Sequence, residues 1–117
     1  MNFSKEEIAL CKEIAKYYRL PNSLWVCKES EDNVIFDYAG DFQYFPPYIP
    51  LWTWQDARDW LRERNWFLVL RNFGNVSHFG IWKEEQREPK SYKYAQAGKT
   101  DLEAILKVVL EILREGK

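Results

Sequence analysis

His78 is the single histidine of this chain, and most hydrolytic or metal chemistry would have to use it. A Ser-His-Asp or Cys-His site needs an imidazole as its base, and a zinc site needs several histidines or cysteines close together. Cys11 and Cys27 are not spaced as C-x-x-C, and no histidine accompanies either of them. We therefore predict no metal site and no cofactor, two buried reduced thiols, and a hydrogen-bonded structural role for His78 in a strand.

Carboxylate pairs are the other candidates for chemistry. Asp37 and Asp41 flank Tyr38, and pairs of carboxylates can perform general acid and base catalysis. In a chain with 18 acidic residues such pairs occur by chance, so they are weak evidence for catalysis. The sequence also contains no P-loop, no G-x-G-x-x-G and no G-x-S-x-G motif, which are common signatures of phosphate binding and acyl transfer. We predict that the protein is not an enzyme. The enzymatic alternative requires Asp37, Tyr38, Asp41 or His78 to converge in one pocket.

The most unusual feature is an aromatic, proline-containing segment at residues 42–52. The chain has 6 Trp, 7 Tyr and 7 Phe, more than a core of this size can hide completely. Two interpretations stay open: the rings cap one end of the core, or they form a contact surface, where Trp and Tyr often dominate binding. The predicted partner-binding residues of this segment are Phe42, Tyr44, Phe45, Tyr48 and Trp52.

The prolines of this segment determine what backbone we expect there. Pro46, Pro47 and Pro50 restrict the chain and remove three hydrogen-bond donors. Proline is rare inside sheets for the same reason. We therefore predict an extended path on the surface over residues 42–52, and no strand.

The elements that precede this segment are a helix and a hairpin. Ser4, followed three residues later by Glu7, forms a capping-box pattern that predicts a helix beginning at Ser4 and ending before Pro21. Residues 24–28 and 34–38 are short and rich in β-branched and aromatic residues, and they flank an acidic turn. This pattern predicts two antiparallel strands.

The second half of the chain predicts a helix, three strands and a helix. Thr53 and Thr100 each begin a capping-box pattern followed by apolar residues at helical spacing. Residues 67–72 are apolar on both alternate sets, which predicts a central strand covered on both faces, and strands follow at 76–83 and 91–97. We predict an α+β fold in a single domain over residues 1–117, of order α-β-β-α-β-β-β-α, with a mostly antiparallel sheet covered by helices.

Charge and hydropathy bound the location and the partners. The 17 Lys and Arg residues and 18 Asp and Glu residues give a net charge of −1, so no positive field attracts nucleic acid or an anionic membrane. The N-terminus carries charges where a signal peptide would be apolar, and no apolar run approaches the length of a transmembrane helix. We expect a cytoplasmic protein without membrane association.

Spacing patterns over residues 46–114 resemble a known group. The matching segments are a proline-bearing approach, a helix with a Trp, an aromatic strand, a second strand with a Trp and a closing helix: Pro46-Pro47-Tyr48, residues 56–61, the strand after Asn65-Trp66, Gly80-Ile81-Trp82 and residues 95–113. These segments are similar to the phage ABA sandwich domain family. The resemblance implies a phage or prophage origin and expression in the cytoplasm of a bacterial host, and it implies no reaction.

These observations predict a non-catalytic phage or prophage accessory protein that binds a host or phage protein, including a defence protein. The alternative is a domain that binds double-stranded RNA, because residues 53–114 have the order helix, three strands, helix, with Lys99 before the last helix. Asp101 and Glu103 place negative charge where such a domain would need positive charge. Homodimer formation is left open, since small domains with a free strand edge often pair.

Overall fold

The chain forms two compact units, Met1–Trp52 and Thr53–Lys117, called unit 1 and unit 2. The computed structural model describes residues 2–42, 45–83, 89 and 91–116. The α+β class and the predicted order of elements are confirmed, with one additional strand in unit 1. The expectation of a single domain over residues 1–117 stays a prediction.

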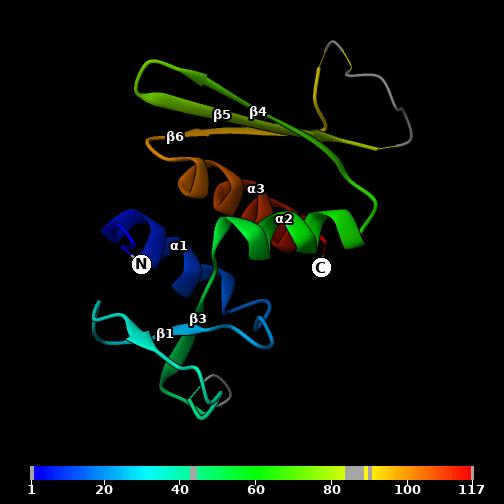
Figure 1. Cartoon of the computed structure of the whole chain (residues 1–117). Coiled ribbons are helices and arrows are strands. Elements are labelled where there is room, and N and C mark those ends of the chain that lie inside the picture. Colours follow the sequence, from blue (N-terminus) through cyan, green and yellow to red (C-terminus); the bar gives the residue numbers. More distant parts are fainter. Residues whose placement is uncertain (1, 43–44, 84–88, 90, 117) are drawn as a thin grey trace. The chain divides into compact units, whose positions relative to one another are not determined.

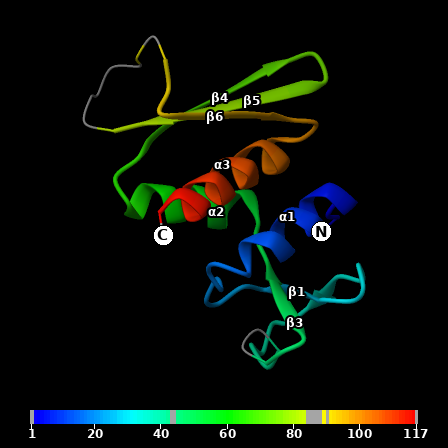
Figure 2. The ribbon, with the colours of Figure 1, turned by 180° about the vertical axis from the view of Figure 1, so that it is seen from behind.

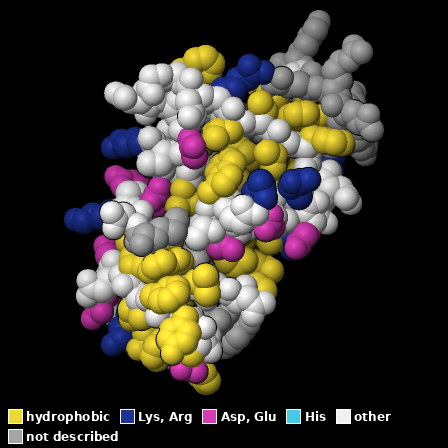
Figure 3. Space-filling model, viewed as in Figure 1, with side chains coloured by type: hydrophobic (Ala, Val, Ile, Leu, Met, Phe, Trp, Pro, Cys, Tyr) yellow, Lys and Arg dark blue, Asp and Glu magenta, His cyan; other side chains and the backbone are white. Residues whose placement is uncertain are grey.

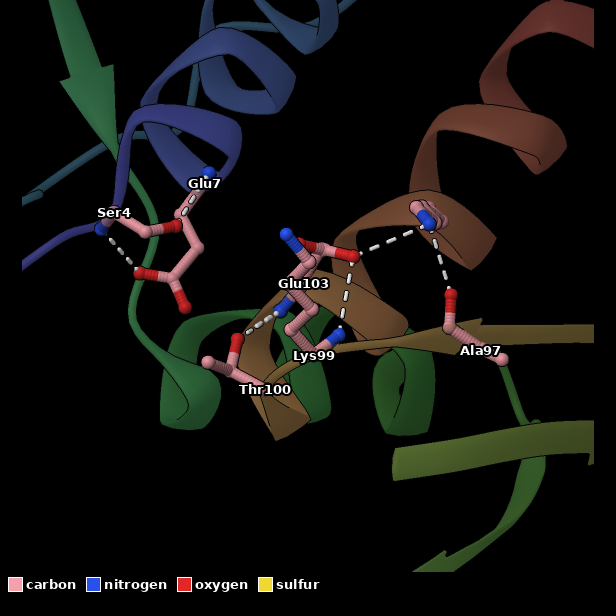
Figure 4. Close-up of polar contacts among 7 residues, drawn as sticks. Ser4, Glu7, Ala97, Lys99, Thr100 and Glu103 are labelled. Atoms are coloured by element: carbon pink, nitrogen blue, oxygen red, sulfur yellow. Dashed lines mark hydrogen bonds and ion pairs between the residues drawn. The ribbon is translucent and has the colours of Figure 1, made fainter. Parts of the chain in front are cut away.

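Unit 1 begins with α1 (Lys5–Ile14), whose start is fixed by the predicted capping box. The Ser4 Oγ accepts a hydrogen bond from the Glu7 backbone N at 3.1 Å, and the Glu7 Oε1 accepts one from the Ser4 N at 2.8 Å (Figure 4). These two bonds satisfy donors that the first turn of a helix leaves unpaired. The apolar residues Ile8, Cys11 and Ile14 of α1 are buried.

The sheet of unit 1 has the order β2-β1-β3 and is antiparallel (Figure 1). Strands β1 (Trp25–Lys28) and β2 (Ile35–Phe36) form the predicted hairpin, with Trp25 opposite Phe36. β2 has two residues only, and a strand this short presents little free backbone at the sheet edge.

Strand β3 (Tyr48–Leu51) corrects the expectation of an unpaired path across the prolines. It pairs with β1 along its whole length, and Pro50 lies opposite Val26. Proline is tolerated here because β3 is an edge strand with one neighbour, so a missing N–H can point away from β1. The apolar residues that follow the cis Pro46-Pro47 bond therefore enter the sheet.

Unit 2 consists of a three-stranded antiparallel sheet and two helices (Figure 2). Its elements are α2 (Trp54–Glu63), β4 (Phe67–Phe73), β5 (Val76–Trp82), β6 (Tyr94–Gly98) and α3 (Asp101–Glu115). The sheet order is β4-β5-β6, and both helices lie on the same side of the sheet (Figure 1). Among the described residues of unit 2, no helix lies on the opposite side of the sheet, which is called the open face.

Strand β4 corrects a second expectation, because it is an edge strand and β5 is the central one. Leu68 and Leu70 are half-buried, whereas Phe67 and Phe73 on the alternate set are exposed. Apolar residues on both sides of a strand usually indicate two covered faces. In β4 the second apolar set lies on the open face of the sheet.

Buried charge at the start of α3 has a structural explanation. Glu103 is buried, and its Oε2 accepts a hydrogen bond from the Lys99 backbone N at 3.2 Å (Figure 4). The Lys107 Nζ lies 3.2 Å from the same oxygen and donates to the Ala97 carbonyl oxygen at 2.9 Å. The Thr100 side chain caps the helix by accepting from the Glu103 N at 3.0 Å. These contacts join the end of β6 to the first turns of α3.

Candidate functional site

The five predicted partner-binding residues lie in different environments of unit 1. Phe42 and Phe45 are exposed, the latter by 63%, and Tyr48 is half-buried in β3. Trp52 is 1% exposed. Tyr44 lies outside the residues that the structure describes. Phe42 and Phe45 are therefore accessible to a partner, whereas Trp52 is part of the core. Each of the two interpretations of the segment applies to some of its residues.

Trp52 belongs to the core of unit 1, which corrects its assignment as a contact residue. Its backbone N donates to the Cys11 Sγ at 3.4 Å, and its ring centroid lies 5.9 Å from that of Tyr18. The residue directly follows β3, so pairing of that strand with β1 draws it inward. A partner cannot contact this ring without opening the fold.

Phe42 is held at the surface by ordered neighbours. Asp37 is 3% exposed, and its two carboxylate oxygens accept hydrogen bonds from the backbone N of Asp41 at 2.9 Å and of Phe42 at 3.1 Å. The Phe42 ring centroid lies 4.8 Å from that of Tyr48. The Arg19 Nη2 donates to the Tyr48 carbonyl oxygen at 2.6 Å. The Asp37 carboxylate therefore positions the backbone up to Phe42, and the Phe42 ring packs on that of Tyr48 in β3.

The structure adds three exposed apolar residues that the sequence analysis did not assign to a contact surface, Leu24, Phe36 and Tyr38. Tyr38 is 80% exposed, and its ring stacks on that of Phe36 with a centroid distance of 6.1 Å. For Phe36 and Tyr38 a signal exists in the sequence, because these aromatic residues flank Asp37 at the end of a short predicted strand. Together with two predicted residues they form the aromatic patch, defined as Leu24, Phe36, Tyr38, Phe42 and Phe45. Figure 3 shows hydrophobic side chains gathered over unit 1.

The open face of unit 2 carries a second concentration of aromatic residues. Ser77, Phe79 and Ile81 of β5 are buried, whereas His78 on the alternate set is exposed. A Cβ on Gly80 would lie 2.7 Å from ring atoms of Tyr92, so the Tyr92 ring packs directly against this glycine. No other residue type leaves room for that contact.

A hollow of about 330 Å³ lies on this open face. Arg71 and His78 face each other across β4 and β5, and His78 contacts Phe73 edge-to-face with a centroid distance of 5.4 Å. His78 lies in strand β5, as predicted, with its side chain exposed, and its structural role stays a prediction. The hollow is lined by residues of all three strands and by the preceding Tyr92: Val69, Arg71, His78, Phe79, Gly80, Tyr92, Ala95, Gln96 and Ala97.

The candidate acid and base groups have identifiable roles or positions. The Asp37 carboxylate binds two backbone N–H groups, which is a loop-positioning role. Tyr38 and Asp41 are exposed in unit 1, and His78 belongs to unit 2. Within the described part of the chain, no group of three or more His, Cys, Asp or Glu residues is placed to hold a metal ion.

Cys11 and Cys27 are reduced and fully buried thiols, as predicted. Burial raises the pKa of Cys27 above its usual range, and the nearby Lys12 and Asp32 act in opposite directions on it. The thiol is therefore uncharged at neutral pH, and a thiol in this state is a poor nucleophile. Both cysteines contribute to packing in unit 1.

Comparison of the chain with known protein families, with curated proteins and with solved structures found no match. The resemblance to the phage ABA sandwich domain family stays a prediction. Among the described helices, none combines the length and the apolar character needed to cross a lipid bilayer.

Proposed function

We propose that this protein is a non-catalytic binding protein whose aromatic patch docks onto another protein, in a phage or prophage setting inside a bacterial host. The observation that carries the proposal is the exposure of five apolar residues in unit 1, with Tyr38 exposed by 80% and Phe45 by 63%, and with the Tyr38 ring stacked on the exposed Phe36. Scattered apolar residues are normal on a protein surface, but neighbouring exposed rings mark interaction sites.

The physical gain from covering the patch is large. Burial of apolar surface contributes about 25 cal/mol per Å², and an aromatic side chain buries on the order of 150–250 Å². The patch also requires little ordering on binding, because Asp37 holds the loop before Phe42 and the Tyr38 ring already stacks on Phe36. Preorganised contact residues lose less entropy when they bind.

The charge of unit 1 favours a basic partner. Residues 1–52 contain five Lys or Arg and eight Asp or Glu residues. Asp41 is exposed immediately before Phe42. We therefore expect the partner to present an apolar pocket with Lys or Arg at its rim, because such complementarity accelerates association and fixes orientation.

Alanine substitution at Tyr38 and Phe45 is expected to weaken partner binding by roughly 30-fold or more each, since central aromatic residues contribute about 2 kcal/mol or more. The partner is first identified by affinity purification from the bacterial host with mass spectrometry. The dissociation constant of the purified pair is then measured by biolayer interferometry.

Phe73→Ala provides a matched control for Phe45→Ala. Phe73 is the same residue type and is 61% exposed, but it lies in unit 2 outside the aromatic patch. The control variant should bind the partner like the unmodified protein. Equal losses at Phe45 and Phe73, or no loss at Tyr38 and Phe45, would show that the patch is not the docking surface.

Binding of double-stranded RNA is the second candidate function, and the arrangement of unit 2 favours it. A helix, a three-stranded antiparallel sheet and a helix follow one another, with both helices on one side of the sheet. The charges near α3 oppose this candidate, because Lys107 is paired with the buried Glu103 and Asp101 begins the helix. Phosphate contacts require cations that are accessible.

We expect no saturable binding to an RNA duplex of about 20 base pairs at protein concentrations up to about 100 µM, the weak end of non-specific affinities. Fluorescence anisotropy at low and at physiological salt measures this directly. A dissociation constant that rises steeply with salt concentration would instead support the nucleic-acid function and count against the protein-binding proposal.

A further inference from the structure

Among the described strands, three of the four sheet edges carry features that hinder pairing with another chain. β2 has two residues only, and β3 contains Pro50 and directly follows Pro47. At the edge formed by β6, the Lys107 Nζ donates to the Ala97 carbonyl oxygen at 2.9 Å, so this backbone acceptor already has a partner. Short strands, prolines and lysines are features by which proteins prevent association through sheet edges.

The fourth edge, formed by β4, lacks these features. The strand is seven residues long, it contains neither proline nor lysine, and no described strand pairs with its outer side. Alternate residues of an antiparallel strand direct their backbone N–H and C=O groups away from the neighbour with which the strand pairs. Such a row of unpaired backbone groups is a template for another strand.

β4 also carries an exposed aromatic ring at each of its ends. Phe67 and Phe73 are both exposed and lie on the open face of the sheet. The Phe67 ring stacks on Trp82 of β5 with a centroid distance of 5.8 Å, and the Phe73 ring contacts His78 of β5 edge-to-face at 5.4 Å. These contacts order both rings, and ordered contact residues lose less entropy on association.

We propose that β4 pairs antiparallel with β4 of a second copy of this chain, about a two-fold axis at Leu70. The pairing joins two three-stranded sheets into one sheet of six strands. In this register Phe67 of each copy lies opposite Phe73 of the other copy, and aromatic cross-strand pairs stabilise antiparallel sheets. Because the two copies present the same strand, both aromatic pairs form at once. This dimer is independent of the aromatic patch in unit 1.

The residues of β4 favour this register over its neighbours. Arg71 is the only charged residue of the strand, and in this register it lies opposite Val69 of the other copy. A shift by two residues in one direction places the two Arg71 side chains directly opposite each other, where like charges are destabilising. The same shift in the other direction places Phe73 opposite Asn65, outside β4, and removes both aromatic pairs. A shift by one residue moves each ring to the opposite face from its partner.

The size of the interface predicts a weak dimer. Seven residues of strand extend about 24 Å and a sheet layer is about 10 Å thick, so each copy contributes a strip on the order of 240 Å². Stable interfaces bury about 1,200 Å² or more in total, and smaller ones are typical of transient association. We therefore expect a dissociation constant on the order of 100 µM. The net charge of −1 is close to zero and gives little repulsion between copies.

Sedimentation velocity of the full chain between about 5 and 500 µM tests the dimer, because this range brackets the expected dissociation constant. The average mass should rise from 14.1 kDa toward twice that value. Phe73→Lys should raise the dissociation constant by about tenfold or more, since it removes both aromatic pairs and adds a lysine to the edge. Phe45→Lys makes the same change at an exposed residue outside β4 and should associate like the unmodified protein. A constant mass of 14.1 kDa, or equal losses in the two variants, would overturn the proposal.

Cysteine cross-linking tests the register. Phe67→Cys and ¹⁵N-labelled Phe73→Cys chains are mixed in a glutathione redox buffer, and the linked dimers are identified by mass. In the proposed register the two different variants place their thiols opposite each other, within reach of a disulfide, whereas two copies of one variant place them about 20 Å apart. The native Cys11 and Cys27 are buried.

The mixed disulfide-linked dimer should exceed each dimer of a single variant by about tenfold or more, because only the mixed pair meets the distance requirement. Dispersed amide signals of each variant show that it is folded. A purely statistical mixture of linked dimers would show that β4 does not pair in this register and would overturn the proposal.

Discussion

Trp52→Ala is expected to lower the free energy of unfolding by about 3–5 kcal/mol, the cost of removing a large aromatic side chain from a core. The ring is 1% exposed and packs beside Tyr18, so its removal leaves a cavity that the surrounding residues fill only partly. Urea unfolding followed by far-ultraviolet circular dichroism measures the change.

Phe45→Ala serves as the control for this substitution. Phe45 belongs to the same aromatic segment, but its ring is 63% exposed, and its truncation should change stability by about 0.5 kcal/mol or less. The two variants separate the two roles that the sequence left open for the segment. Unchanged stability of Trp52→Ala would contradict the placement of this ring in the core.

Gly98→Val is expected to lower the free energy of unfolding by about 1–3 kcal/mol through overpacking. A Cβ at this position would lie 2.8 Å from the Ala104 backbone N and 2.8 Å from the Glu103 Oε2. Backbone in the first turn of α3 cannot move aside as a flexible side chain can. The helix must therefore shift away from β6, which disturbs the contacts of the buried Glu103 carboxylate.

Ala95→Val is the matched control for Gly98→Val, because both substitutions introduce valine into β6. Ala95 is exposed, and valine suits a strand, so the change in stability should be within about 0.5 kcal/mol. Thermal unfolding and hydrogen exchange of the α3 amides provide the measurements. Equal stabilities of the two variants would show that β6 and α3 do not approach each other closely at Gly98.

The two destabilising substitutions also test the predicted single domain, because Trp52 belongs to unit 1 and Gly98 to unit 2. A chain that unfolds as one cooperative domain shows one transition, and both variants lower its midpoint. Calorimetry that resolves two transitions, each moved by only one of the variants, would instead assign each unit its own cooperative unfolding.

The sequence determined those features that depend on residues close together along the chain. Ser4, Thr53 and Thr100 were each predicted to begin a helix, and in each case the side-chain oxygen accepts a hydrogen bond from the backbone N three residues later. The hairpin of residues 24–38 and the successive strands at 67–72 and 76–83 were also predicted from local composition and alternation, and both antiparallel pairs are present. Capping and tight turns involve three or four consecutive residues, so local sequence is sufficient to specify them.

Only the tertiary structure decided which apolar residues are buried. Trp52 and Phe45 have the same local context of aromatic residues and prolines, yet one is enclosed and the other is exposed. The difference arises because β3 pairs with β1, a contact between segments about twenty residues apart that local periodicity does not encode. The hollow beside Tyr92 has the same origin, since it requires Gly80, Arg71 and Ala95 to be brought together from three strands. Residue types show which side chains could be buried or could bind a partner. The pairing of distant strands decides which of these side chains are buried and which stay exposed.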